Sequence, residues 1–243
     1  MAAALAYDER MQLGTVRDAP RRAVVPRPLL PGPFRMAAAV LLAACVAVTA
    51  VVRVHFLGRP QYPSRGRPGW LSSAVDPRLQ AALRPFPALL RWLPEFGTLA
   101  AVTLMTVALV LACLPARRWR EAILAAVAVP AASGLTEYLL KPFVGQPAGQ
   151  PSFPSGHATT MFALAAICAI VLLDPPRRVP GAVRLILALV ALLVAAAVAA
   201  AMVAIGAHYF TDAVAGAAVG IGVVLACALT LDLVASFGPV RRY

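Results

Sequence analysis

Charged residues are scarce in this chain of 243 residues. They make up 13% of the sequence, whereas apolar residues make up 61%, and the mean hydropathy is +0.80. Soluble globular domains carry roughly 25% charged residues, because their surface faces water. The composition therefore excludes an ordinary soluble domain and indicates a protein with several membrane spans.

The chain also lacks the residue groups that hold a metal ion or form a disulfide framework. Its four cysteines, Cys45, Cys113, Cys168 and Cys227, lie far apart, in or at the ends of apolar runs. That placement is typical of small core residues. The ten acidic residues form no carboxylate cluster, so neither a metal site nor a cofactor is expected.

Lysine is almost absent, although the formal net charge is +12. Of the 22 basic residues, Lys141 is the only lysine. No basic run is interleaved with aromatic residues, so a nucleic-acid partner is not expected. Short arginine-rich loops instead indicate the cytoplasmic side of a membrane. Because arginine does not replace lysine in a tight polar site, Lys141 is a candidate functional residue.

Six apolar runs have lengths near that needed to cross a bilayer. They lie at about 36–57, 96–114, 121–140, 158–173, 183–205 and 213–235. The sequence therefore predicts an all-α polytopic membrane protein with a six-helix transmembrane bundle. In the last run, Gly216 and Gly220 form a small-xxx-small pair that allows two helices to pack closely.

Polar segments flank and divide the predicted membrane domain, 36–235. Residues 1–35 are rich in proline and arginine, which predicts a mobile cytoplasmic tail, and residues 236–243 form a short basic tail. Residues 58–95 mix tryptophan, proline and arginine, which is typical of an extracytoplasmic segment at the membrane interface. With six spans, both tails and the two short arginine loops lie on the cytoplasmic side.

In this topology, three polar clusters that are distant in sequence fall together on the outer face. Lys141 ends the third span, Pro154-Ser155-Gly156-His157 begins the fourth, and His208 and Asp212 lie between the fifth and sixth. A serine after a proline, before an apolar run, is a signature of a helix N-terminus. The free N–H groups of such an end suit an anion.

The residue types in these clusters predict phosphoryl transfer. A carboxylate at the spacing of Asp212 can orient the His208 imidazole and make its other nitrogen a better nucleophile. His157 can protonate a leaving group. Lys141 and the Ser155-Gly156 dipeptide can hold an anion whose charge grows in the transition state. We therefore expect metal-independent transfer of a phosphoryl group to histidine, followed by hydrolysis.

These motifs resemble those of the type 2 phosphatidic acid phosphatase superfamily, which includes membrane lipid phosphatases, glucose-6-phosphatase and vanadium haloperoxidases. The resemblance covers about residues 121–235. It implies that His208 is the nucleophile that becomes phosphorylated, that His157 protonates the leaving group and that Asp212 orients the nucleophile. It assigns phosphate binding to Lys141, Ser155 and Gly156.

The resemblance implies an integral-membrane lipid phosphate phosphatase that acts through a phosphohistidine. Phosphatidate, a phosphatidylglycerol phosphate and a polyprenyl phosphate or diphosphate are the candidate substrates. Together with the topology, it places the protein in the plasma membrane with its active site on the extracytoplasmic face. Neither the choice among these lipids nor the oligomeric state follows from the sequence.

The chain departs from the family pattern at the two motif arginines. Counting from Lys141 puts Ala148, or Gln146 at a shorter spacing, where the first arginine belongs. Ala201 and Met202 stand where the third motif has Ser-Arg. Losing one transition-state donor costs about a hundredfold or more in rate. Candidate replacements are the arginines of the interfacial segment, such as Arg65, Arg67, Arg84 and Arg91.

Two alternative functions remain open. The absent arginines favour a catalytically degenerate protein that binds an anionic lipid headgroup or a partner protein. Ionisable residues at membrane depth favour a channel or transporter, with Glu137 as the candidate. However, Glu137 and Lys141 are four residues apart and can neutralise each other. Asp232 is expected to be solvated near the cytoplasmic end.

Overall fold

The computed structural model describes residues 28–57, 70–144, 153–173 and 179–237. These residues are helical and contain no strand. The helices are α2 (Gly32–Leu57), α3 (Trp70–Leu83), α4 (Pro87–Phe96), α5 (Leu99–Cys113), α6 (Trp119–Gly134), the π-helix η1 (Leu135–Leu140), α7 (Lys141–Val144), α8 (Gly156–Leu173), α9 (Gly181–Ala204) and α10 (Phe210–Phe237). The predicted all-α fold class is confirmed.

Most of each apolar run of the sequence is helical, but the helices differ in how well they span a membrane. Four are long and apolar enough by themselves: α2, α6 with η1, α9 and α10. The α4–α5 pair adds a fifth if it counts as one span bent by 60°. The apolar part of α8, Gly156–Leu172, is shorter than these spans. The six-span count therefore stays a prediction.

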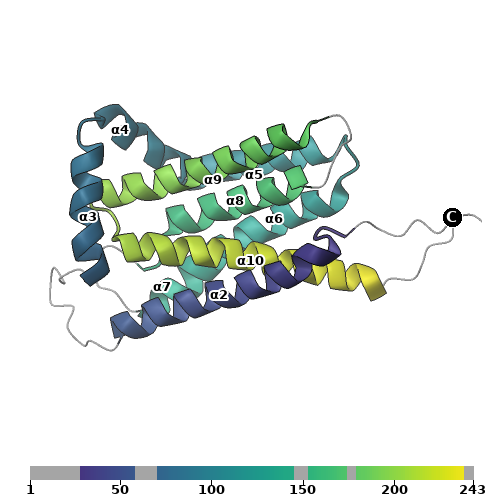
Figure 1. The fold of residues 1–243 in the computed structure, drawn as a ribbon, viewed down its shortest axis with the longest axis horizontal. Coiled ribbons are helices and arrows are strands. Elements are labelled where there is room, and N and C mark those ends of the chain that lie inside the picture. Colours follow the sequence, from purple (N-terminus) through teal and green to yellow (C-terminus); the bar gives the residue numbers. More distant parts are fainter. Residues whose placement is uncertain (1–27, 58–69, 145–152, 174–178, 238–243) are drawn as a thin grey trace, which may run out of the picture.

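The long helices run side by side, and α10 is at the centre of their packing (Figure 1). Helix α10 packs against α8, α2 and α6, while α8 also packs against α9 and α6. Helix α3 lies across one end of the bundle, where it contacts α9 and α10 (Figure 1). The polar residues at that end are therefore covered by a helix that does not belong to the bundle itself.

Two glycines of α10 allow its close approach to α8. A β-carbon on Gly216 would lie 2.4 Å from the carbonyl oxygen of Ser155, and one on Gly220 would lie 2.2 Å from that of Thr159. Real β-carbons do not come this close to backbone atoms, so a side chain at either position would push the helices apart. The packing role predicted for this pair is confirmed.

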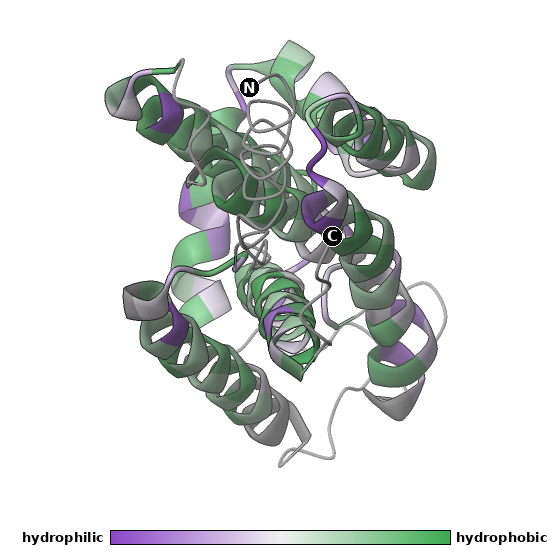
Figure 2. Ribbon diagram, turned by 90° about the vertical axis from the view of Figure 1, so that its right-hand side faces the viewer, coloured by the Kyte–Doolittle hydropathy of each residue, from purple (hydrophilic) through white to green (hydrophobic). Residues whose placement is uncertain are grey.

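The helices are mostly hydrophobic, as the hydropathy colouring in Figure 2 shows, and many of their exposed side chains are apolar. Large aliphatic side chains such as Val40, Leu104 and Leu193 are 65%, 70% and 67% exposed. The buried interior, by contrast, contains polar side chains including Ser155, Thr159 and Asp212. An apolar exterior around a partly polar interior is the arrangement of an integral membrane protein.

Asp232, near the end of α10, is buried rather than solvated, which corrects the expectation from the sequence. Its carboxylate accepts the backbone N–H groups of Leu29 (2.7 Å) and Leu30 (3.0 Å). It also pairs with Arg120 at 2.7 Å and Arg35 at 3.7 Å. Its position near the helix end suggested contact with water, but the chain before α2 folds back and covers it.

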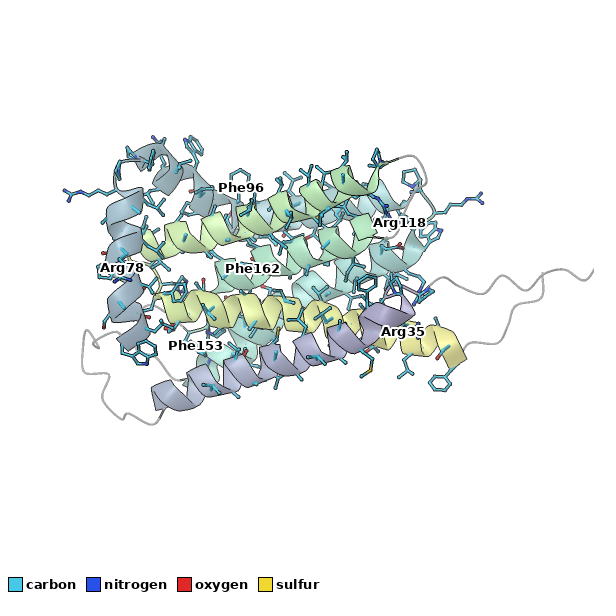
Figure 3. All side chains as sticks on the ribbon, in the orientation of Figure 1. Arg35, Arg78, Phe96, Arg118, Phe153 and Phe162 are labelled. Carbon is cyan, nitrogen blue, oxygen red and sulfur yellow. The ribbon has the colours of Figure 1, made fainter. Side chains whose placement is uncertain are left out.

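This network anchors the first described residues to the bundle. Leu29 and Leu30 are buried, so the predicted tail, 1–35, includes a portion that packs on α10. Residues 1–27 and the predicted C-terminal tail beyond residue 237 lie outside the described part. Figure 3 shows Arg35 and Arg118 at this end of the bundle, and Arg78 and Phe153 at the opposite end.

Candidate active site

The three polar clusters of the sequence meet at the end of the bundle that α3 covers. Ser155 immediately precedes α8 and is fully buried. Its hydroxyl accepts the N–H of Ala158 at 3.4 Å, so it caps the helix as predicted. Its own backbone N–H donates to the carbonyl of Asp212 at 3.0 Å. This last bond joins the start of α8 directly to the start of α10.

His208 and Asp212 lie beside each other, although not in a hydrogen bond. The distance from His208 Nδ1 to Asp212 Oδ2 is 3.7 Å, close enough for an ion pair but too long for a hydrogen bond. Oδ2 accepts the backbone N–H of Tyr209 at 3.0 Å instead. His208 Nδ1 is buried and makes no hydrogen bond with the described residues. Hydrogen bonds of this kind are often long without substrate and tighten when it binds.

Lys141 lies at the junction of η1 and α7, next to the start of α8. Its Nζ is 2.5 Å from Glu137 Oε1, so the pair expected from the sequence forms. A β-carbon on Gly156 would lie 2.6 Å from that same carboxylate oxygen and 3.6 Å from Nζ. The lysine and the helix start therefore share one small region, and the Glu137 carboxylate lies in it. The π-helix that carries Glu137 is a rare geometry that occurs frequently at functional sites.

His157, the second residue of α8, completes the cluster. Its ring packs against the backbone of Gly97, at the break between α4 and α5: a β-carbon on Gly97 would lie 2.4 Å from Cδ2 of the ring. The titratable groups close enough to interact with His157 electrostatically are those of His208, Lys141, Glu137 and Glu95. The structure thus brings together all six candidate residues of the sequence analysis.

Helix α3 supports this site through two residues that the sequence analysis missed. Asp76 Oδ1 accepts the N–H of Phe210 at 3.0 Å. The hydroxyl of Ser72 accepts the N–H of Thr211 at 3.4 Å and lies 3.1 Å from the hydroxyl of Thr211. Ser72 and Asp76 are buried and four residues apart, on one face of α3. That spacing, in a segment predicted to lie at the interface, is the signal in the sequence from which they could have been found.

Negative charge accumulates around the start of α10. Burial raises the pKa of Asp76, the hydrogen bond from Phe210 N–H lowers it, and the charge of Asp212 raises it again. Burial likewise raises the pKa of Tyr209, as do the charges of Asp212 and Asp76. The carboxylates in this region therefore repel further negative charge, and the site depends on its cations and N–H donors to hold an anion.

The positions of the missing motif arginines serve packing instead. Ala201 is fully buried in α9. The carbonyl of Met202 accepts hydrogen bonds from the N–H groups of Ala207 (3.0 Å) and His208 (3.3 Å), and these bonds shape the turn before α10.

Of the candidate replacements for these arginines, Arg84 and Arg91 are exposed, and the guanidinium of Arg91 lies 5.4 Å from the ring of Trp92. The other positions named above, 65, 67, 146 and 148, lie outside the described residues. Among the described residues, Lys141 is the basic side chain that reaches the cluster.

A cavity of about 770 Å³ opens from the cluster between α5, α6 and α8. Glu137, Gly156 and His157 line one part of it. Most of the remaining wall is apolar and includes Val107 and Leu111. A cavity with a few polar groups at one part and an apolar remainder suits an amphipathic molecule.

Comparisons with known proteins identify the family and the fold. The family model of the PAP2 superfamily matches residues 33–233. One solved structure with a similar fold is the crystal structure of the first transmembrane PAP2 type phosphatidylglycerolphosphate phosphatase from Bacillus subtilis. It aligns with a TM-score of 0.58 and 15% identity, over 86% of this chain and 100% of that chain. At this identity the likeness is one of fold. A search of curated protein sequences found no significant match.

Proposed function

Because the chain belongs to the PAP2 superfamily, we propose that it is an integral-membrane lipid phosphate phosphatase. In this proposal it hydrolyses a phosphomonoester or diphosphate lipid at the extracytoplasmic face of the plasma membrane. The observation that carries the proposal is the junction between Ser155 and Asp212. It joins the start of α8, which carries His157, to the start of α10 next to His208. Lys141 lies near the same helix start, beside an apolar cavity.

In the first step, Nε2 of His208 attacks the phosphorus atom of the lipid phosphate. Asp212 lies next to Nδ1, the other ring nitrogen, and stabilises the positive charge that the ring gains. The bond between phosphorus and the lipid oxygen breaks, and His157 donates a proton to that oxygen. Lys141 and the N–H groups at the start of α8 hold the phosphoryl oxygens while their charge redistributes.

In the second step, water hydrolyses the phosphohistidine. His157, now neutral, takes a proton from the water as its oxygen attacks phosphorus. The bond between phosphorus and Nε2 breaks, which releases inorganic phosphate and restores His208. The proposed steps use the protein's own groups and water, and the reaction is proposed to be metal-independent.

The apolar cavity supports a lipid as the substrate. With the phosphate at His157, a hydrocarbon chain of the same molecule has an apolar path between α5 and α6. Burial of hydrocarbon contributes about 0.8 kcal/mol per CH₂ group, so several groups provide substantial affinity. The path begins beside the proposed leaving-group acid, where the bond to the lipid oxygen breaks.

The experiment that tests this proposal is phosphate release by the purified full-length protein in detergent. The substrates are phosphatidate, phosphatidylglycerol phosphate and polyprenyl phosphates, with and without a metal chelator. We expect release from at least one lipid, unaffected by the chelator and lost in His208→Ala. A histidine elsewhere, His55 on α2, provides the matched control, and His55→Ala should keep the activity of the wild type. No release from any lipid, while a known family member releases phosphate, contradicts the proposal.

A second candidate, a degenerate protein that binds an anionic headgroup, is favoured by one observation. Among the described residues, the single lysine of the cluster is already paired with a carboxylate. Trapping with a radiolabelled lipid phosphate separates the two functions. A phosphoenzyme that is labile in acid, stable in base and absent from His208→Ala supports catalysis. Headgroup binding without any phosphoenzyme supports the degenerate protein.

A further inference from the structure

The carboxylate of Glu137 lies where the proposed phosphate-binding groups converge. Its Oε1 is 2.5 Å from Lys141 Nζ. The same oxygen lies so close to the start of α8 that a β-carbon on Gly156 would approach it to 2.6 Å. These are the lysine and the helix start to which phosphate binding is assigned above. An anion of the protein itself therefore occupies the position in which the phosphate of a substrate has to bind.

We propose that Glu137 is an internal competitor for the phosphate and that the substrate must displace its carboxylate from Lys141 before it binds. This inference rests on the proposed function, because it takes Lys141 and Gly156 as phosphate-binding residues. It adds a specificity-determining residue to that site. A phosphate group enters the site only if its binding free energy exceeds the cost of displacing the Glu137 carboxylate from Lys141.

Charge explains why the carboxylate and a phosphate exclude each other. Lys141 carries one positive charge, whereas a phosphomonoester carries about −1.5 to −2 at neutral pH. A phosphate seated between Lys141 and Gly156 would lie within a few ångströms of the carboxylate, and like charges at that distance repel each other. Among the described residues, no second lysine or arginine reaches the cluster to compensate this repulsion.

The position of Glu137 allows it to move aside. Its side chain is 42% exposed, whereas that of Lys141 is 23% exposed. It lines the cavity that begins at His157, so the carboxylate can swing away from Lys141 without disturbing the packed helices. An exposed ion pair of this kind contributes little to stability. Its removal should therefore change binding and leave the fold intact.

Binding of inorganic phosphate to the purified full-length protein, measured by isothermal titration, tests the proposal directly. We expect Glu137→Gln and Glu137→Ala to bind phosphate at least fivefold more tightly than the wild type. For a lipid substrate they should lower KM by a similar factor and leave kcat within about twofold. The matched control is Glu95→Gln. It removes another carboxylate that acts on His157 but has no contact with Lys141, and its dissociation constant should stay within about twofold of the wild type.

Weaker or unchanged phosphate binding in both Glu137 variants would overturn the proposal, since Glu137 would then only hold Lys141 in place. An equal gain of phosphate affinity in Glu95→Gln would also overturn the proposal, because the gain would then come from the change in net charge and not from release of Lys141. If the Glu137 variants bind phosphate more tightly but no form of the protein hydrolyses a lipid, the competitor role is supported and the proposed phosphatase function is refuted. The two proposals therefore fail in distinguishable ways.

Discussion

The imidazole of His157 lies directly on the backbone of Gly97, with no space for a side chain between them. A β-carbon at residue 97 would lie 2.4 Å from Cδ2 of the ring and 2.9 Å from Cγ. Gly97 follows α4 at the bend of 60° between α4 and α5. The backbone of Gly97, at the break in this helix pair, therefore fixes the position of the His157 ring, the proposed leaving-group acid.

This contact predicts that Gly97→Ala lowers kcat. The added methyl group must push the ring of His157 away from its position, and a positioned general acid contributes about 10²–10⁴-fold to a rate. We expect kcat for a lipid phosphate to fall at least tenfold, with little change in helix content by circular dichroism. The control is Gly134→Ala, whose β-carbon would come no closer than 4.0 Å to a neighbouring side chain. Full activity of Gly97→Ala would show that the position of the ring does not matter.

The packing of α8 on α10 predicts that Gly216→Ala destabilises the protein. Its methyl group would meet the carbonyl of Ser155, a backbone atom that cannot rotate away. Overpacking of this kind costs about 1–3 kcal/mol. Thermal unfolding in detergent measures the loss. Gly222→Ala, on the same helix, would meet the β-carbon of Cys45 at 3.3 Å, a milder clash, and should destabilise the protein less than Gly216→Ala. Equal effects of the two variants would contradict this account.

The support from α3 predicts different outcomes for two variants of Asp76. Asp76→Ala leaves the N–H of Phe210 without its acceptor, and an unsatisfied buried group costs about 1–3 kcal/mol. Because the same turn carries His208, kcat should also fall. Asp76→Asn keeps a carbonyl oxygen that can accept this bond and should keep the activity, and at least the stability, of the wild type. Activity and thermal unfolding of the two variants give the comparison, and identical behaviour would refute a capping role.

The raised pKa of Asp76 predicts the pH dependence of stability. The folded protein holds this proton more tightly than the unfolded chain, whose pKa is the ordinary 3.8. The stabilisation is therefore complete below that pKa and is lost as the pH rises through the higher pKa of the folded protein. Relative to Asp76→Asn, which does not titrate, the wild type should lose stability as the pH rises above 3.8. Denaturation of both proteins at several pH values measures this difference, and a relative gain would have the wrong sign.

The buried carboxylate at the opposite end predicts a stability effect without an effect on activity. Asp232→Ala removes the partner of Arg120 and the acceptor of two backbone N–H groups. Breaking a buried ion pair costs about 3–5 kcal/mol. The activity per folded molecule should not change, because the network lies far from the histidines. Thr230→Ala, an exposed position on the same helix, is the control and should be neutral. A loss of activity that exceeds the loss of folded protein would contradict this separation.

The extent of the long helices was predictable because it depends on local properties of the chain. The run predicted at 213–235 lies within α10, Phe210–Phe237, and the run at 183–205 overlaps α9, Gly181–Ala204. Apolar length and the breaks between runs suffice for this. The number of spans was less predictable, because α8 is short and the second span is bent against α4.

The residues that form the candidate site were also largely predictable from the sequence. The predicted alternation of spans places every second loop on one face, which puts Lys141, His157 and His208 at the same end of a bundle. Ser155 had to cap a helix because of its place before an apolar run. These conclusions follow from order and spacing along the chain, without any knowledge of which helices are neighbours.

Only the tertiary structure decided how these groups meet. The distance of 3.7 Å between His208 and Asp212, and the placement of Glu137 against Gly156, depend on how α8 and α10 pack. The bonds from Asp76 and from Asp232 join residues more than a hundred positions apart, 76 with 210 and 232 with 29. The sequence by itself determined the helices, the end at which the polar residues gather and the chemistry they can perform. The close packing of helices through small residues decided which polar groups are in contact. Such a contact depends on the whole fold and not on the local sequence.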